Sequence, residues 1–171
     1  MKRIHLFLTG AIIGLMAAGQ MSCSSSKTAA RNERAETVKQ QLESRRYTID
    51  VDRMLPMQGP SQHLTTNYGL TIKGDTVISY LPYFGRAYSV PYGGGKGLNF
   101  EALISDYSLV FDAKGVAKIS FRTRSEDDLY LYEAEVFNNG KTTLRVTSNN
   151  RQGISFYGQL KEEVQLAEQE S

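Results

Sequence analysis

Cysteine, histidine and tryptophan are scarce or missing in this sequence. It has one cysteine, two histidines and no tryptophan among 171 residues. A single cysteine excludes an intrachain disulfide, and a zinc site would lack the nitrogen and sulfur ligands that it needs. After residue 22 the only histidine is His63, and no Gly-x-Ser-x-Gly motif accompanies it. We therefore predict a non-enzymatic protein with no catalytic residue, no metal and no cofactor.

Net charge is low as well. The sequence has 20 basic and 18 acidic side chains. Two of the basic residues, Lys2 and Arg3, lie at the extreme N-terminus, so a chain that begins at residue 23 carries 18 charges of each sign. A neutral chain has no long-range field to steer it onto a polyanion. We predict that the protein does not bind nucleic acid.

The first 22 residues have the layout of an export signal. Lys2 and Arg3 precede an apolar stretch at residues 6–18, which is shorter than the ~20 residues of a membrane-spanning helix. A short segment then leads to Ser22 and Cys23. This arrangement resembles a bacterial lipoprotein signal, in which the cysteine is acylated and becomes the first mature residue. We predict a signal peptide at residues 1–22 and lipidation of Cys23.

The predicted anchor assigns the protein to the cell envelope. Each buried methylene of an acyl chain contributes roughly 0.8 kcal/mol, so an acylated Cys23 would hold the chain on a membrane without a spanning helix. Neither Ser24 nor Ser25 is acidic, which favours attachment to the outer membrane with the domain facing the periplasm. The alternative is an ordinary secretory signal cleaved near Ala18 or Ser22, with Cys23 as an incidental thiol.

Composition divides the chain after the signal into three parts. Residues 23–31 are small and polar and predict a flexible tether. Residues 32–160 predict a single β-rich domain, because tyrosine, phenylalanine and β-branched residues are common there. Residues 161–171 form a polar, acidic tail.

One helix is predicted at the start of the domain. Ala35, Val38 and Leu42 recur at spacings of three and four residues, which places them on one helical face. Asn32 is a suitable N-cap. We predict an amphipathic helix over residues 32–45 that packs on a sheet or on the end of a barrel.

From residue 47 onward, apolar residues alternate with polar ones. Tyr47, Ile49 and Val51 occupy every second position, which is the spacing of a half-buried strand. Asn139 and Gly140 give the strongest hairpin signal, since both tolerate the left-handed backbone of a tight turn. Strands are predicted at residues 47–52, 63–72, 76–80, 107–112, 116–123, 129–137, 141–147 and 154–160.

Strands joined by short loops form an antiparallel meander. An open meander of about eight strands leaves its edges and one apolar face uncovered, so it tends to close on itself. The predicted fold is therefore mainly β, with the meander closing into a small, lipocalin-like barrel or half-barrel.

A block of aromatic residues between residues 80 and 92 has two interpretations. In the first, the rings fill the mouth of the barrel or pack beneath the glycine-rich segment at residues 93–97. In the second, the block lines a site for a small apolar or amphiphilic ligand, with the glycine-rich segment as a flap. The candidate ligand-binding residues are Tyr80, Tyr83, Phe84, Arg86, Tyr88 and Tyr92.

The same block carries a family resemblance. The run from Tyr80 to Tyr88, followed by Pro91 and Tyr92, is similar to a motif of the DUF4251 family of uncharacterised bacterial proteins. The resemblance extends over most of the chain after Cys23 and implies an exported lipoprotein with a β-rich fold. It implies no activity, because the family has none assigned.

Two further motifs admit a chemical and a structural interpretation. Asp75-Thr76-Val77 resembles a short O-glycosylation acceptor of exported Gram-negative proteins and predicts a glycan on Thr76, although a hairpin turn accounts for the same residues. Glu133 and Glu135 share one face of a predicted strand, as the two carboxylates of a retaining glycosidase do. A solvated strand face gives the same pattern.

Together these observations predict a lipid-anchored envelope protein that binds a small apolar or amphiphilic ligand or another envelope component. The alternative is a structural or interaction module in which an exposed strand edge pairs with a partner chain. A carboxylate-based hydrolase is the third hypothesis.

Overall fold

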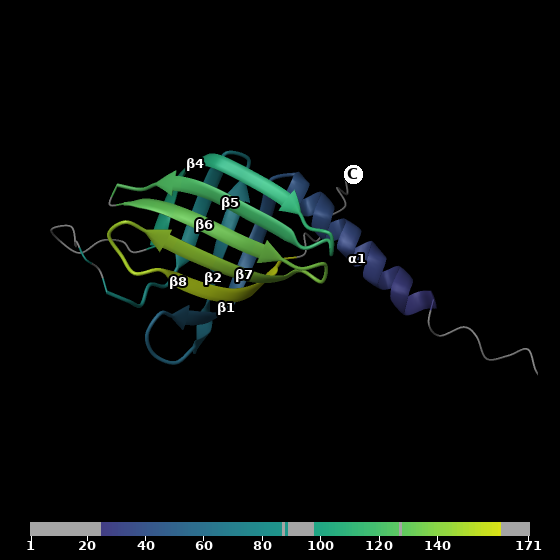
Figure 1. Cartoon of the computed structure of the whole chain (residues 1–171), viewed down its shortest axis with the longest axis horizontal. Coiled ribbons are helices and arrows are strands. Elements are labelled where there is room, and N and C mark those ends of the chain that lie inside the picture. Colours follow the sequence, from purple (N-terminus) through teal and green to yellow (C-terminus); the bar gives the residue numbers. More distant parts are fainter. Residues whose placement is uncertain (1–24, 87, 89–97, 127, 162–171) are drawn as a thin grey trace, which may run out of the picture.

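A closed barrel of antiparallel strands makes up most of the structure (Figure 1). The computed structural model describes residues 25–86, 88, 98–126 and 128–161. Its elements are α1 (Ser25–Glu43), β1 (Arg46–Pro56), β2 (Gln62–Lys73), β3 (Thr76–Leu81), β4 (Leu98–Phe111), β5 (Ala117–Arg124), β6 (Leu129–Val136), β7 (Lys141–Ser148) and β8 (Ile154–Leu160). Each strand pairs with the next along the chain, and β1 pairs with β8 to complete the circle. The prediction of a mainly β meander that closes into a small barrel is confirmed.

The alternation of apolar and polar residues decides which side chains enter the barrel. In β6, Tyr130, Tyr132 and Val136 are buried, whereas Glu133 and Glu135 between them are exposed. The same period of two runs through β5 and β7, as expected for strands with one face on a core and one in water.

Stacked aromatic rings occupy the centre of the barrel. The ring centroids of Phe121 and Tyr132 lie 5.0 Å apart, with planes only 2° from parallel. The buried Tyr132 hydroxyl donates to Ser79 Oγ at 3.0 Å, and Ser79 Oγ donates to the Leu98 carbonyl at 2.7 Å. Burial raises the pKa of Tyr132, so its hydroxyl stays neutral and keeps the proton that it donates. This polar chain ties β6, β3 and β4 together through an otherwise apolar core.

Helix α1 meets one end of the barrel, called here the helix end. Only the last turns of α1 pack on the strands, through the buried side chains of Val38 and Leu42. In Figure 1 the N-terminal part of α1 projects away from the barrel. The structure corrects the predicted start of the helix, because α1 begins at Ser25 instead of Asn32. The described part of the predicted tether, residues 25–31, is helical. Alanine, lysine and arginine are common there, and all three are good helix formers.

Arg45 closes the helix end. It has a positive φ of 55°, which turns the chain from α1 into β1. Its guanidinium carbon lies 4.3 Å from the ring centroid of Tyr107, and it forms an ion pair with Asp75 at 3.0 Å. The hydroxyls of Tyr107 and Tyr47 share a hydrogen bond of 3.2 Å beside this pair. These contacts link the chain after α1 to β1, β4 and the β2–β3 turn.

Strand β4 begins much earlier than the sequence predicts. The inward positions of β4 recur at every second residue, at Leu98, Phe100, Ala102 and Ile104, but the next inward residue is Tyr107. An irregularity in the β4–β5 register between Ser105 and Ser108 accounts for the shift. Because this bulge breaks the period of two, the alternation after it predicts a strand only from residue 107.

The seam that closes the barrel depends on two glycines. Both ladders of β1, with β2 and with β8, shift register between Val51 and Arg53, so β1 bends sharply there. A Cβ added to Gly158 of β8 would collide with the Asp50 carbonyl oxygen, and one added to Gly69 of β2 would lie 2.9 Å from the Ile49 carbonyl oxygen. Glycine lets the neighbouring strands approach the bent part of β1 from both sides.

Substitution of Gly158 is expected to destabilise the barrel. In Gly158→Ala the new methyl group meets backbone of β1 that cannot move without opening the seam. We expect a loss of about 3 kcal/mol in the free energy of unfolding. Urea denaturation followed by circular dichroism measures this loss.

Gly153→Ala is the matched control. The nearest atom to its added Cβ is the Thr147 methyl group at 3.2 Å, which a small side-chain shift can accommodate. We expect a change below about 1 kcal/mol. Equal losses for the two variants would contradict the role assigned to Gly158.

Candidate functional site

The barrel interior is filled by its own side chains in the part of the chain that the structure describes. Phe121, Tyr130, Tyr132 and Phe156 are each at most 2% exposed. Leucine, isoleucine and valine side chains surround them to form one continuous core. The barrel is therefore a packed body, and candidate sites lie on its outer surface and at its rims.

Three of the six candidate ligand-binding residues lie together at the rim opposite α1. There the segment after β3 is bound to the turn between β7 and β8. The Tyr83 hydroxyl donates to the carbonyl groups of Arg86 and Gln152 at 3.0 and 3.1 Å. The Gln152 backbone N–H donates to the Arg86 carbonyl at 3.0 Å, and the Tyr88 N–H donates to the Asn150 carbonyl at 2.7 Å.

The other candidate residues do not join this cluster. Tyr80 is 47% exposed on the outside of β3, where its ring centroid lies 5.1 Å from that of Tyr68. Phe84 is exposed at the rim. Tyr92 lies outside the described residues, as do the signal segment and Cys23. The role of the block in ligand binding stays a prediction.

Asp128 supports the same rim from the β5–β6 turn. Its buried carboxylate accepts the backbone N–H of Leu129 at 2.8 Å, and the backbone N–H and side-chain amide of Asn150 at 3.3 Å each. The guanidinium carbon of Arg151 lies 5.5 Å from the Tyr83 ring centroid, and burial raises the pKa of Tyr83. The aromatic block is thereby part of a hydrogen-bonded closure of the rim.

The remaining candidates occupy separate surface positions. His63 lies on β2 and shares a hydrogen bond of 3.1 Å with Arg53, and Thr76 is partly exposed at the start of β3. Glu133 and Glu135 are both exposed on the outside of β6. The hydrolase role of the two glutamates and the glycosylation of Thr76 stay predictions. Within the described residues, no group of three His, Cys, Asp or Glu side chains is placed to hold a metal ion.

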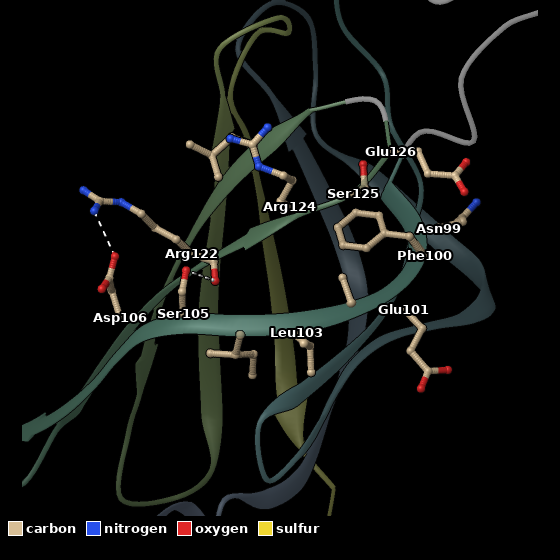
Figure 2. A pocket seen from close by; sticks show the side chains of 13 residues that line it. Asn99, Phe100, Glu101, Leu103, Ser105, Asp106, Arg122, Arg124, Ser125 and Glu126 are labelled. Atoms are coloured by element: carbon tan, nitrogen blue, oxygen red, sulfur yellow. Dashed lines mark hydrogen bonds and ion pairs between the residues drawn. The ribbon is translucent and has the colours of Figure 1, made fainter.

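The outer surface has a groove of about 820 Å³ where β4 and β5 separate. Figure 2 shows side chains of β4 along one wall, and side chains of β5 and the following turn along the other. Leu103 is 74% exposed beside it. Arg122 forms an ion pair with Asp106 at 3.1 Å at one end of the groove, and Arg124 lies farther along the same wall.

The first half of β4 has a free backbone edge along this groove. Strand β5 pairs with β4 only from Ile104 onward, whereas β3 pairs with it from Leu98 to Leu103. The Ile104 N–H donates to the Asp75 carbonyl on the β3 side. Backbone groups alternate in direction along a strand, so those of Asn99 and Glu101 face the groove. No strand among the described residues pairs with this edge.

A side chain substitutes for the missing ladder at the end of the edge. The Thr123 hydroxyl donates to the Leu103 carbonyl at 2.8 Å, in the place where the next backbone pair of β4 and β5 would form. Beyond Thr123 the β5 strand leaves β4, and the two backbones diverge along the groove. The predicted strand at residues 116–123 ends where β5 leaves β4, but the edge itself was not predicted, because the first half of β4 was missed. The inward positions of Leu98, Phe100 and Ile104 were the available signal.

Comparison with known proteins identifies the family and supports the fold. The family model described as a domain of unknown function, DUF4251, matches residues 29–160. The crystal structure of a DUF4251 family protein from Bacteroides eggerthii is similar to this chain, with a TM-score of 0.56 at 16% sequence identity, and the match covers 77% of this chain and 89% of that one. None of the curated proteins matches this chain. The protein therefore belongs to the DUF4251 family.

Proposed function

We propose that this protein is a lipid-anchored interaction module of the cell envelope, and that its barrel binds an extended segment of another envelope protein along the free edge of β4. The observation that carries the proposal is the combination of a filled interior with an edge at Asn99 and Glu101 whose backbone groups pair with no strand that the structure describes. An extended peptide can add to such an edge as a further strand.

The surroundings of the edge indicate the chemistry of the partner segment. Side chains of an added strand would lie over Leu103, which is 74% exposed, and next to the guanidinium groups of Arg122 and Arg124. Glu101 and Glu126 line the same groove. A partner segment with an apolar residue opposite Leu103 and with both acidic and basic side chains is complementary to this groove. A segment with a large net charge is not.

A small apolar or amphiphilic ligand remains a second candidate occupant of the protein. The filled core would place such a ligand on the outside of the barrel or at the rim, where Phe84 and Tyr88 are 56% and 69% exposed. Mass spectrometry of the natively purified protein detects a ligand that co-purifies with it.

The proposed lipid anchor at Cys23 would keep the barrel at a membrane surface. The sequence before Cys23 supports export, and acylation of this cysteine would hold the barrel to a membrane. Within the part of the chain that the structure describes, no helix is long and apolar enough to cross a membrane.

Lipidation makes a specific prediction about Cys23. Mass spectrometry of the N-terminal peptide from detergent-extracted protein is expected to show an acylated Cys23, and Cys23→Ser is expected to move the protein from the membrane fraction to the soluble fraction. An unmodified thiol in membrane-bound wild-type protein would refute the anchor while leaving the β4 proposal intact.

Strand addition makes a specific prediction about Glu101. Its N–H faces the groove and not β3, so Glu101→Pro removes a donor from the free edge without breaking the β3 ladder. A photo-crosslinking residue at Leu103 is expected to give a discrete adduct in native envelopes. Glu101→Pro should lower the yield of this adduct at least tenfold, whereas Glu101→Ala, which keeps the N–H, should preserve it.

Val110 supplies a position control on the same strand. It is 58% exposed on the outside of β4, but there β4 is paired with β5. A crosslinker at Val110 is expected to give no such adduct. Equal adducts at both positions, or an adduct that survives Glu101→Pro in a protein with unchanged circular dichroism, would rule out pairing at this edge.

A further inference from the structure

The outer half of α1 makes few contacts with the barrel, one of which is a hydrogen bond of 3.1 Å from Arg34 Nε to the Asn139 carbonyl. Its side chains from Lys27 to Arg34 are all exposed, and the buried residues of the helix, Val38 and Leu42, come later. Isolated helices of this length are marginal in water, and most helices in proteins are stabilised by packing. A helical segment that is polar on all sides is stabilised by side-chain pairs within it or by contact with another part of the protein.

One face of this half is basic. Lys27, Arg31 and Arg34 lie at spacings of four and three residues, which places them on a single stripe of α1. The stripe continues along the helix to Val38, so it extends the packed face beyond the barrel. Like charges at this spacing repel one another and destabilise a helix in isolation. An acidic partner along the stripe would reverse that effect.

The chain leaves the barrel beside this stripe. Lys161 follows β8, where its N–H donates to the Thr48 carbonyl at 2.8 Å and its carbonyl accepts the Gln41 side-chain amide at 3.1 Å. A crevice of about 310 Å³ lies here between α1 and the barrel. Arg34 and Val38 line it from the helix together with Glu33, and Leu160 lines it from β8.

The next residues of the chain have the matching composition. Residues 162–171 contain four glutamates, Glu162, Glu163, Glu168 and Glu170, and no lysine or arginine. Val164 and Leu166 lie among them. The segment thus supplies the opposite charge for the stripe and apolar side chains for the crevice.

We propose that residues 162–171 dock on the basic face of α1, with their apolar residues in the crevice and their glutamates along Lys27, Arg31 and Arg34. The reach is sufficient, because Val38 and Lys27 are about 16 Å apart along the helix axis. Ten residues span about 15 Å as a helix and about 33 Å when extended. The docked segment fixes the direction in which α1 leaves the barrel.

Hydrogen exchange of the intact chain tests this docking. Backbone amides of residues 27–36 are compared between the full-length protein and a chain that ends at Lys161, which retains the contacts with Thr48 and Gln41. We expect exchange in this segment to be at least tenfold faster in the shortened chain, because an unsupported helix opens more often. The amides of β6 and β7 are the internal control and should be unchanged.

Charge variants separate docking from a nonspecific effect of shortening. A full-length variant with all four tail glutamates replaced by glutamine should exchange faster in this segment than the unmodified full-length chain. Arg31→Glu should also accelerate exchange of this helical segment, and Lys39→Glu, on an exposed position off the stripe, should not. Unchanged exchange of α1 in the shortened chain would overturn the proposal.

An anionic membrane surface is the competing partner for the basic stripe. Vesicles of phosphatidylcholine with phosphatidylglycerol, and of phosphatidylcholine alone, are added to the full-length and shortened chains. Protection of α1 that appears only with anionic vesicles, and equally in both chains, would overturn tail docking in favour of headgroup binding. Protection of α1 that depends on the tail in the absence of vesicles supports tail docking.

Discussion

The fold depends on one close approach of backbones, at the seam where the first strand meets the last. Strand β1 bends between Val51 and Arg53, and its ladders with β2 and with β8 both shift register at this place. Gly158 permits this contact on the β8 side, and Gly69 does so on the β2 side. A sheet that did not bend here would keep two free edges, and the aromatic core would be open to water.

Closure in turn determines where binding chemistry can be located. In the described part of the chain, the stacked rings of Phe121 and Tyr132 and the side chains around them fill the barrel, although barrels of about eight strands are wide enough to hold a small ligand. Recognition is then left to outward-facing groups. Where β4 and β5 separate, no strand among the described residues pairs with the backbone groups of Asn99 and Glu101, and this edge is the site of the proposed binding of an extended chain.

The sequence predicted the regular parts of this fold and missed the irregular ones. Alternation located most strands, and Asn139-Gly140 predicted the β6–β7 hairpin, where Gly140 has a φ of 78°. The first half of β4 was missed because the bulge that includes Asp106 reverses the inward and outward positions. Nothing in the sequence indicated that Asp128 holds the rim together, because its partner Asn150 is distant along the chain. Periodicity reports local geometry, whereas such contacts depend on the assembled barrel.

The pairing of β1 with β8 also constrains the order of folding. Ile49 pairs with Leu160, so the earliest strand obtains its second neighbour only when the final strand is available. Hairpins from β2 to β7 can form between sequence neighbours as they emerge, but the ring of hydrogen bonds cannot be completed before the end of the domain is released. Such long-range pairings form slowly. A chain that ended before β8 would therefore remain an open sheet with β1 along one unprotected edge.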